Sequence, residues 1–502
     1  MKKKGHTLDR RGFLKLSAAT TLGLSILHLE SAGSRFLPPP LRRKFGKIDF
    51  DVTTLGLGGQ AALQWTPEGV DPVEIILKAV DMGINYFDTS NLYGPSQLNL
   101  GKAFRTLSII PGEENYNRRL RESIFVTSKT HIRWAKGGYP ELENVKNWTN
   151  GDHGEGAVAD LKRSVSQLFG DGQGNYPEGA YLDMILAHNL NFMEEVDVLY
   201  KGLENPLNKD ENFGAFVALR DYRDGTNYTG LNPNRERLVH HIGFSGHNNP
   251  PVMIEMIQRD EFEILDAMLV SINVNDRKMF NMQHNVIPVA TAKNLGVIGM
   301  KVFADGAMYD KDARWSRTPA DVVKKVGTKQ LPSRPLIEYA LTTPGVHTVI
   351  IGVGYIDKDP MKCQLVQNFY AAQITPNGMS EQKRLEAEEL GTLAKDGKTN
   401  YFQEGYRGLT PPQDIQFKRS GSTVNLCWAM AFAGENPISH YDILKNGEVI
   451  YKVVHKPLTS KVKMNYLDTS AGNNDVYQII TVDTKGQTKA SEEFSTSKQQ
   501  NL

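Results

Sequence analysis

The chain has 502 residues, too many for one ordinary domain of roughly 100–200 residues, and its length suits one large domain with a smaller one. Apolar residues make up 40% and charged residues 23%, which allows a packed core and excludes a wholly disordered chain. Lysine and arginine total 58 against 57 acidic residues, so the net charge of +1 excludes a strongly basic nucleic-acid binder, and 2 cysteines cannot build a disulfide framework or a cysteine-rich zinc site.

Residues 1–33 have the layout of an export signal. A basic start precedes a mildly apolar run over 16–29, and small residues follow it. That run is too short and too rich in Thr, Ser and Gly to span a membrane, and no later stretch is apolar enough. Residues 9–15 (DRRGFLK) resemble the twin-arginine motif, with Asp9 in place of the usual Ser or Thr. We expect an exported protein, periplasmic or otherwise extracytoplasmic, with no membrane span in its mature chain; the alternative is a basic disordered tail.

From 47 to 395, short apolar runs alternate with amphipathic patterns of helical period. Eight runs predict strands, at 53–57, 84–87, 124–128, 181–187, 239–244, 267–272, 296–301 and 346–351. Helices are predicted between them, among others at 73–82, 158–169, 252–259 and 335–342. This alternation favours an α/β fold, a (β/α)8 TIM barrel, over an open doubly wound sheet. Residues 201–236 are polar and turn-rich, and we interpret them as a long insertion after the fourth strand.

The pattern changes near the end of the barrel. Residues 396–412 are polar and contain Gly and Pro, as in a linker, and 413–495 hold several short runs with an alternating period. Asn446-Gly447 lies between two apolar pairs, which is a strong hairpin signal. We therefore expect a small all-β sandwich domain with Trp428 and Tyr477 in its core.

The carboxyl ends of three predicted strands carry chemically useful side chains. Asp88 follows the second strand with Tyr93 five residues on, Lys129 ends the third strand, and His188 ends the fourth. Barrels of this type collect their catalytic groups at these ends, so all four are expected on one rim.

This set suits hydride transfer to a carbonyl. The oxygen becomes an alkoxide and needs a proton, which a tyrosine can give, although its free pKa is about 10. A neighbouring ammonium would lower that pKa, a carboxylate would hold the ammonium, and a histidine would orient the carbonyl oxygen.

Residues 83–101 (GINYFDTSNLYGPSQLNLG) strongly resemble the aldo-keto reductase signature. The resemblance spans about 48–372 and continues at 126–129 (VTSK), 186–188 (LAH), 242–245 (IGFS), 296–301 (GVIGMK) and 351–354 (IGVG). The family's catalytic tetrad carries over as Asp88, Tyr93, Lys129 and His188. The resemblance implies a barrel that uses NADP or NAD without a Rossmann motif to interconvert a carbonyl and an alcohol.

The resemblance also implies the cofactor-binding residues. These are Gly58, Gly59, Ser245, Asn273, Met300, Lys301, Gly352 and Asn368. Gly246 and Leu269 stand where the family often has Asn and Gln, and no Arg or Lys cluster follows Gly352 to bind a 2′-phosphate, which leaves NAD and NADP open. An exported enzyme would meet no ordinary nucleotide pool, so a tightly bound cofactor is one expectation.

Substrate residues and partners are predicted more coarsely. Trp65 and Trp134 follow the first and third strands and Asn189 follows His188, so these three are candidate contacts for a small carbonyl or alcohol, a sugar-like molecule included. We expect no metal site, because His240 and His241 point to opposite faces of a strand. Residues 410–495 resemble a fibronectin type III module, which implies contact with a glycan or a protein.

Two rival functions remain open. Residues 56–61 (GLGGQA) fit a dinucleotide fingerprint, but that motif needs a helix to open at once, and the predicted helix begins only near Pro72. The other rival is a barrel with little or no catalysis that serves as a scaffold for the sandwich.

Overall fold

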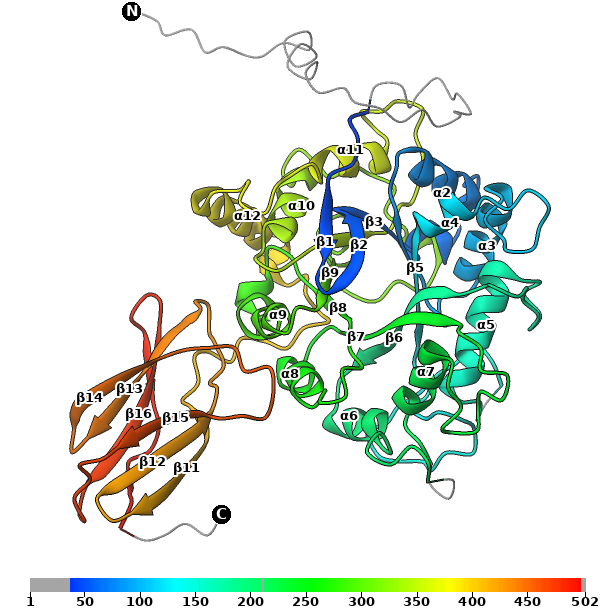
Figure 1. The fold of residues 1–502 in the computed structure, drawn as a ribbon. Helices are drawn as coiled ribbons and strands as arrows, with labels where there is room; N and C mark the ends of the chain where they lie inside the picture. Colours follow the sequence, from blue (N-terminus) through cyan, green and yellow to red (C-terminus); the bar gives the residue numbers. More distant parts are fainter. Residues whose placement is uncertain (1–36, 153, 209–211, 498–502) are drawn as a thin grey trace, which may run out of the picture. The chain divides into compact units, whose positions relative to one another are not determined.

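The computed structural model describes residues 37–152, 154–208 and 212–497 (Figure 1). The predicted export signal at 1–33 lies outside these ranges. Within them, no helix is both long enough and apolar enough to cross a membrane.

Eight parallel strands close into a barrel in the order β10-β3-β4-β5-β6-β7-β8-β9. They are β3 (Leu55–Gly58), β4 (Tyr86–Asp88), β5 (Phe125–Thr130), β6 (Leu182–Leu190), β7 (Val239–Gly246), β8 (Ala267–Ser271), β9 (Gly296–Met300) and β10 (Thr348–Ile351). β10 pairs with both β3 and β9, which closes the ring and excludes the open sheet. The strands are buried on both faces, so they are near-continuous apolar runs, and the predicted barrel is confirmed.

Helices surround the barrel (Figure 1). They are α2 (Pro72–Asp81), α3 (Ser96–Thr106), α4 (Arg118–Glu122), α5 (Ala157–Phe169), α6 (Met193–Tyr200), α7 (Ala215–Asp224), α8 (Pro250–Gln258), α9 (Met282–Ala292), α10 (Ser333–Leu341), α11 (Gln364–Ala371) and α12 (Glu381–Leu393). Short 3₁₀ helices are η2 (Ala61–Leu63), η3 (Asp276–Lys278), η4 (Ala304–Gly306), η5 (Pro319–Asp321) and η6 (Ala394–Gly397).

The segment 201–236, predicted as an insertion after the fourth strand, lies between β6 and β7. It contains α7, whose apolar face, including Phe216, Leu219 and Tyr222, is buried. The charged and turn residues on either side of this helix concealed its apolar stripe in the sequence.

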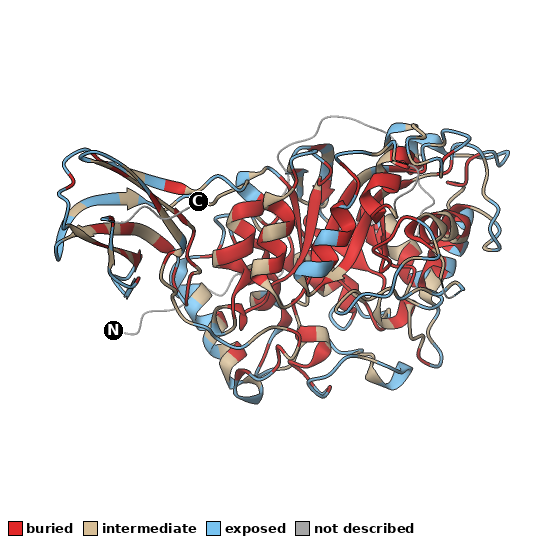
Figure 2. Ribbon diagram, turned by 90° about the horizontal axis from the view of Figure 1, so that it is seen from below, coloured by how far each residue is buried: buried red, intermediate tan, exposed pale blue. Residues whose placement is uncertain are grey.

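A hairpin closes the amino-terminal end of the barrel. β1 (Arg42–Phe45) and β2 (Ile48–Thr53) pair antiparallel. Phe45 packs edge-on against Tyr86 and Phe125 inside the apolar core of the barrel. Figure 2 shows that burial concentrates in the barrel strands and the inward faces of their helices. The opposite rim is left free for chemistry.

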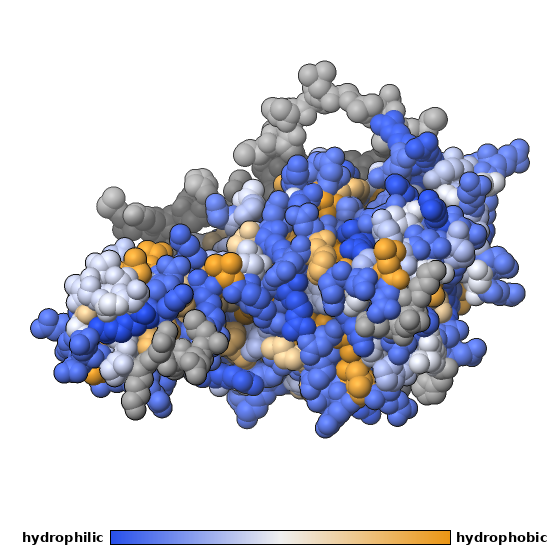
Figure 3. Space-filling view, turned by 60° about the horizontal axis from the view of Figure 1, so that its bottom comes forward, coloured by the Kyte–Doolittle hydropathy of each residue, from blue (hydrophilic) through white to orange (hydrophobic). Residues whose placement is uncertain are grey.

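An all-β region follows the barrel. One sheet holds β11 (Gln413–Ser420), β12 (Thr423–Ala429) and β15 (Met464–Asp468); the other holds β13 (Ile438–Lys445), β14 (Glu448–Val454), β16 (Val476–Asp483), β17 (Thr488–Ala490) and β18 (Phe494–Ser495). Both sheets contribute to one core around Trp428, Tyr441 and Tyr477, which confirms the predicted sandwich. Asn446 and Gly447 take positive φ between β13 and β14, as a tight hairpin requires. The face drawn in Figure 3 is mostly hydrophilic, with scattered hydrophobic patches.

Candidate active site

The four residues predicted to be catalytic come together at the carboxyl end of the barrel. Asp88 is the last residue of β4, Tyr93 lies in the turn before α3, Lys129 is in β5 and His188 is in β6. A register shift and a left-handed Asn189 interrupt β6 directly after His188. Such irregularities re-aim side chains next to active sites.

Lys129 and Asp88 form a buried ion pair. Lys129 Nζ donates to Asp88 Oδ1 at 2.5 Å and to the carbonyl oxygen of Thr89 at 2.8 Å. Burial raises the pKa of Asp88 and lowers the pKa of Lys129, and in each case the partner's charge opposes burial. The other carboxylate oxygen, Oδ2, has no hydrogen-bond partner among the described residues. The expected role of Asp88 in holding the ammonium is consistent with this geometry.

Tyr93 lies directly over this pair. Lys129 Nζ is 4.7 Å from the centre of the Tyr93 ring, and the His188 ring packs edge-on at 5.7 Å. Burial raises the pKa of Tyr93 well above its ordinary value, and the carboxylates of Asp88 and Asp305 raise it further. This direction of the pKa shift is opposite to the predicted lowering, because burial and the two carboxylates dominate the surroundings of the phenol. Tyr93 therefore rests as a neutral phenol, the form that donates a proton.

His188 is neutral as well. Its Nδ1 lies 3.3 Å from Ser90 Oγ, and burial, reinforced by nearby Lys129, holds the pKa of the imidazole well below its ordinary value. Behind it, Arg133 donates to the His188 carbonyl oxygen at 2.7 Å and pairs with fully buried Glu195 at 2.8 Å. No local sequence pattern reveals this supporting pair, because Glu195 lies 62 positions further along the chain.

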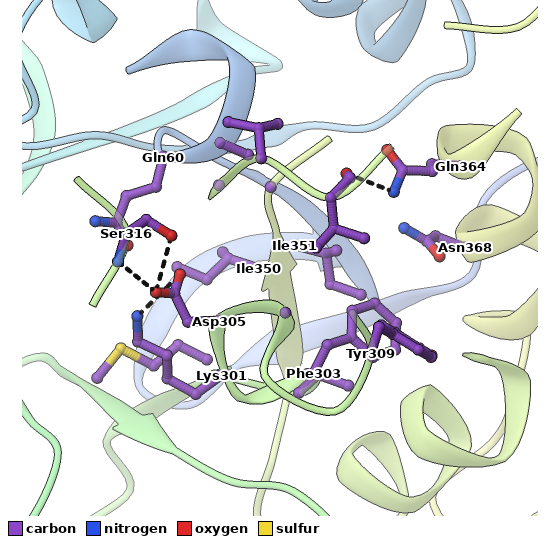
Figure 4. Close-up of a pocket in the computed structure, with 18 of the residues that line it drawn as sticks. Gln60, Lys301, Phe303, Asp305, Tyr309, Ser316, Ile350, Ile351, Gln364 and Asn368 are labelled. Carbon is purple, nitrogen blue, oxygen red and sulfur yellow. Dashed lines mark hydrogen bonds and ion pairs between the residues drawn. The ribbon is translucent and has the colours of Figure 1, made fainter. Parts of the chain in front are cut away.

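A first pocket extends from the tetrad across the barrel rim (Figure 4). Its walls include six predicted cofactor residues: Gly58, Gly59, Met300, Lys301, Gly352 and Asn368. Ser245 and Asn273 are instead fully buried outside its walls. Ser245 Oγ accepts from the backbone of Asn189, and the Asn273 amide is bonded to Lys301, Asn275 and Asn400. Neither of these two side chains is free to bind a nucleotide as it stands.

Asp305 is the electrostatic centre of this pocket. It accepts from Ser316 at 3.1 Å, from Lys311 at 3.0 Å and from Tyr401 Oη at 3.0 Å, and Lys301 Nζ is 3.6 Å away. Burial opposes the charge of Asp305, but Lys301 and Lys311 outweigh it and hold its pKa below the ordinary value. This carboxylate is therefore ionised and neutralised by two lysines.

The first pocket is lined by glycines and by polar atoms without partners among the described residues. Its strand ends are glycine-lined: a Cβ on Gly59 would lie 2.4 Å from the Asp88 carbonyl oxygen. Tyr309 Oη, buried in the pocket wall, and Asn189 Oδ1, beside the tetrad, have no hydrogen-bond partner in the described part of the chain, so polar groups are available. The charge of the lining suits a nucleotide with negative phosphates less well. The described lining holds two lysines, Lys301 and Lys325, against Asp88, Asp305 and Asp321, and it holds no arginine.

A second, wider pocket of about 660 Å³ opens beside the tetrad. Tyr93, His188 and Asn189 line it, and so do Trp148 and Trp315. Neither predicted tryptophan lines it: Trp134 is buried in the core and Trp65 is partly buried elsewhere. Both lining tryptophans stand in long loops without periodicity, where sequence gives no orientation.

The start of the predicted linker 396–412 lines this pocket too. Tyr401 and Phe402 form part of its wall. Asn400 exchanges two side-chain hydrogen bonds of 3.0 Å with Asn273, and Gln403 donates to Asp276 at 2.7 Å. These bonds join residues 127 positions apart in sequence. The residues just after the barrel are therefore held against its rim.

No group of three or more His, Cys, Asp or Glu side chains in the described ranges is arranged to hold a metal ion. His240 stacks on Tyr181, and His241 lies 3.2 Å from Asp266. The two histidines therefore have separate surroundings.

Comparisons with known proteins identify relatives of the barrel. The chain is 21% identical over 380 residues to the uncharacterized oxidoreductase YqkF of Bacillus subtilis, covering 72% of this chain and 98% of that protein. It is 24% identical over 263 residues to D-arabinose 1-dehydrogenase of Saccharomyces cerevisiae, covering 50% of this chain and 62% of that protein.

Solved structures of similar fold include the holo form of aldo-keto reductase AKR11C1 from Bacillus halodurans, with 18% identity, a TM-score of 0.43 and coverage of 70% and 96% of the two chains. An aldo/keto reductase from Klebsiella pneumoniae, in complex with NADP and acetate, has 16% identity, a TM-score of 0.40 and coverage of 71% and 96%. The family model described as "Aldo/keto reductase family" matches residues 54–359, more than half of the chain. This chain belongs to the aldo/keto reductase family.

Proposed function

We propose that the protein is an NAD(P)-dependent oxidoreductase that interconverts a carbonyl and an alcohol by hydride transfer. The observation that carries the proposal is the buried Lys129–Asp88 pair beneath Tyr93, with His188 on the same rim. Four residue types needed for one reaction meet there although up to 100 positions separate them in the sequence, and the family supports an oxidoreductase.

Each side chain has a role in this proposal. Tyr93 is the general acid in reduction and the general base in oxidation, since its hydroxyl exchanges the proton with the substrate oxygen. Lys129 stabilises the negative charge that develops on Tyr93, and Asp88 holds Lys129 in place. His188 donates a hydrogen bond to the substrate oxygen and orients it.

The cofactor would lie in the first pocket. Gly58, Gly59 and Gly352 let it approach the strand ends, and Lys301 and Asn368 provide polar contacts. A bound nicotinamide would give or take the hydride. The neighbouring structure with NADP supports this class of cofactor. Because the described lining has no arginine, we expect NAD and NADP to bind with similar affinity.

Export remains part of the proposal. The signal-like residues 1–33 support a periplasmic or extracytoplasmic location, where a retained cofactor would be oxidised and reduced in place by successive substrates. The test replaces Arg10 and Arg11 with lysine: the protein should then stay in the cytoplasm. Unaltered export of that variant would reject the twin-arginine interpretation.

The sandwich is proposed to be fibronectin type III-like. Its division into a three-stranded and a five-stranded sheet around Trp428 and Tyr477 supports this. Exposed Val449, Tyr451 and Leu467 provide apolar surface for a glycan or protein partner.

The direct test of the proposed function follows NADH and NADPH oxidation with a panel of aldehydes and ketones, and NAD⁺ and NADP⁺ reduction with the matching alcohols. Turnover with at least one pair is expected, and Lys129→Met should abolish most of it. A protein that binds neither nucleotide would favour the scaffold alternative.

A further inference from the structure

The second pocket has two aromatic walls that face the tetrad. Trp148, on one wall, is 53% exposed, and its ring lies 4.8 Å from that of His131. Trp315, on the other wall, is 40% exposed and lies 5.2 Å from the ring of His247. A single exposed ring is ordinary, but two exposed tryptophans that line one cavity indicate a ligand site.

The histidines on these walls have unused hydrogen-bonding capacity. His131 is 2% exposed, and neither of its ring nitrogens has a hydrogen-bond partner among the described residues; the same is true of Nδ1 of His247. Both side chains line the pocket, and the His131 ring lies 5.4 Å from that of His188. A buried polar atom without a partner costs free energy, which a ligand hydroxyl would recover.

These imidazoles are neutral. Burial lowers the pKa of His131 and of His247 well below the ordinary value, and nearby cations lower it further. A neutral imidazole donates with one nitrogen and accepts with the other, as a hydroxyl group does. It is therefore matched to hydroxyl groups rather than to an anion.

The rest of the lining is amide-rich and almost uncharged. Besides Asn189, the amides are Gln60, Gln64, Asn191, Asn248, Asn249 and Gln403. Lys146 packs its ammonium over the rings of Trp148 and Phe192, and Glu404 is paired with Arg407. An apolar substrate would leave the amide oxygens of Asn189 and Asn248 buried without partners among the described residues, and an anionic substrate would find one cation in the described lining, Lys146, which packs against two rings.

Aromatic platforms together with neutral donors and acceptors match a ring with apolar C–H faces and hydroxyl edges. We propose that the second pocket is a saccharide-binding site, in which Trp148 and Trp315 stack on sugar rings and His131 and His247 bind hydroxyl groups next to the reacting carbon. Its volume of about 660 Å³ lies within the range of pockets for drug-sized ligands, so it accommodates more than one sugar ring. The proposal rests on the proposed function and names its substrate class.

His131 is a positioning residue in this account. It binds a hydroxyl group beside His188 and takes no part in proton transfer. Two rings of the segment after the barrel pack against the wall formed by Trp315 and His247. The ring centre of Phe402 lies 5.9 Å from that of His247, and that of Tyr401 lies 5.3 Å from that of Trp315. This segment therefore shapes the saccharide site.

The experiment uses the full chain with NAD(P)H or NAD(P)⁺. Its probes are glucose, galactose and xylose, the disaccharides cellobiose, lactose and maltose, and cyclohexanecarbaldehyde as an apolar ring of similar size. At least one disaccharide should have a KM about tenfold below that of its reducing-end monosaccharide. Trp148→Ala and Trp315→Ala should each raise that KM about twofold to tenfold, the range expected for an aromatic contact, with kcat nearly unchanged. Tyr228→Ala, which removes an equally exposed ring outside the pocket, should change neither constant.

His131→Phe keeps the ring and removes the nitrogens. It should raise KM for the disaccharide more than for cyclohexanecarbaldehyde, and His131→Gln should restore part of the loss. An equal effect on both substrates would indicate a merely structural role for His131.

Calorimetry with the same saccharides separates this inference from the proposed function. If cyclohexanecarbaldehyde is turned over but no saccharide in the panel binds or reacts, the saccharide site is rejected and the oxidoreductase stands. If no carbonyl is turned over but a saccharide binds in a manner that depends on Trp148 and Trp315, the oxidoreductase falls and the saccharide site stands. Saccharide binding that both tryptophan variants leave unchanged would overturn the inference.

Discussion

At the scale of single residues, the site depends on a charge balance in a buried place. Lys129 and Asp88 are both almost fully buried, so neither charge has water to replace its partner. Substituting only one residue of such a pair leaves the other without its counter-charge. This destabilises the folded protein far more than removing both charges.

This balance gives a stability prediction. Lys129→Met should reduce the free energy of unfolding by about 3–5 kcal/mol, because Asp88 loses its buried counter-charge. The double variant with Asp88→Asn should recover much of that loss, although it stays inactive. Denaturant unfolding of both proteins measures the difference. A double variant no more stable than the single one would show that the pair is not electrostatically coupled.

The raised pKa of Tyr93 determines how the rates of reduction and oxidation should depend on pH. Reduction needs the protonated phenol, which is present at neutral pH, so its rate should be level there and fall only at strongly alkaline pH. Oxidation needs the phenolate, so its rate should rise as pH increases. Because the pKa of His188 is lowered, the imidazole stays neutral and should add no acidic limb between about pH 6 and pH 8. Rates of both directions across this range provide the test, and an oxidation rate that falls with rising pH would contradict it.

At the scale of elements, hydrogen bonds from a helix hold a loop that lines the first pocket. Gln364, the first residue of α11, accepts from Gly354 at 2.8 Å and donates to the carbonyl oxygens of Val323 at 3.0 Å and Lys325 at 2.8 Å. Val323 and Lys325 line the pocket, so these hydrogen bonds fix the position of one of its walls.

Removing the hydrogen bonds of the Gln364 side chain should accelerate nucleotide release. Gln364→Ala is expected to increase the dissociation rate of NAD(P)H by about tenfold, since each lost hydrogen bond contributes about 0.5–1.5 kcal/mol. Gln367→Ala, one turn further on the same helix, removes an exposed amide and is the matched control. Stopped-flow fluorescence measures both rates. Equal rates for the two variants would show that the loop does not limit release.

The sequence predicted the elements that its own periodicity determines. The run at 239–244 falls within β7, and the pattern at 158–169 within α5, because buried parallel strands and amphipathic helices leave local signals. The tetrad was predictable because parallel strands bring their ends together. Trp148, Trp315 and Tyr401 were not, because their positions depend on contacts between distant, aperiodic loops.

At the scale of the whole molecule, the barrel and the sandwich are joined by directional contacts. Asn285 on α9 exchanges hydrogen bonds with the backbone of Ala433, and Asn281 donates to the Gly434 carbonyl oxygen at 2.6 Å. The segment between the two, which includes Tyr401, lines the second pocket. The sandwich is thus connected to the side of the barrel that holds the second pocket.

Two truncations separate these contributions. A chain ending after Asp396 loses the wall that Tyr401 and Phe402 form, so its KM should rise about tenfold or more for the best substrate, whereas a chain ending after Arg407 keeps that wall and most of the activity. Steady-state kinetics with circular dichroism as a folding control compares them. Equal activity of the two chains would mean that the segment does not contribute to the site.

The central claim is that Tyr93 transfers the proton in hydride exchange with a carbonyl. The most direct measurement is turnover of Tyr93→Phe, with nucleotide affinity determined in parallel, and Tyr200→Phe as control because it loses a buried hydroxyl bonded to Met256 away from the rim. The account predicts a fall in kcat of about 10²–10⁴-fold with almost unchanged nucleotide binding, as expected when a general acid is removed, and little change in the control. Turnover of Tyr93→Phe equal to that of the unaltered protein would contradict it.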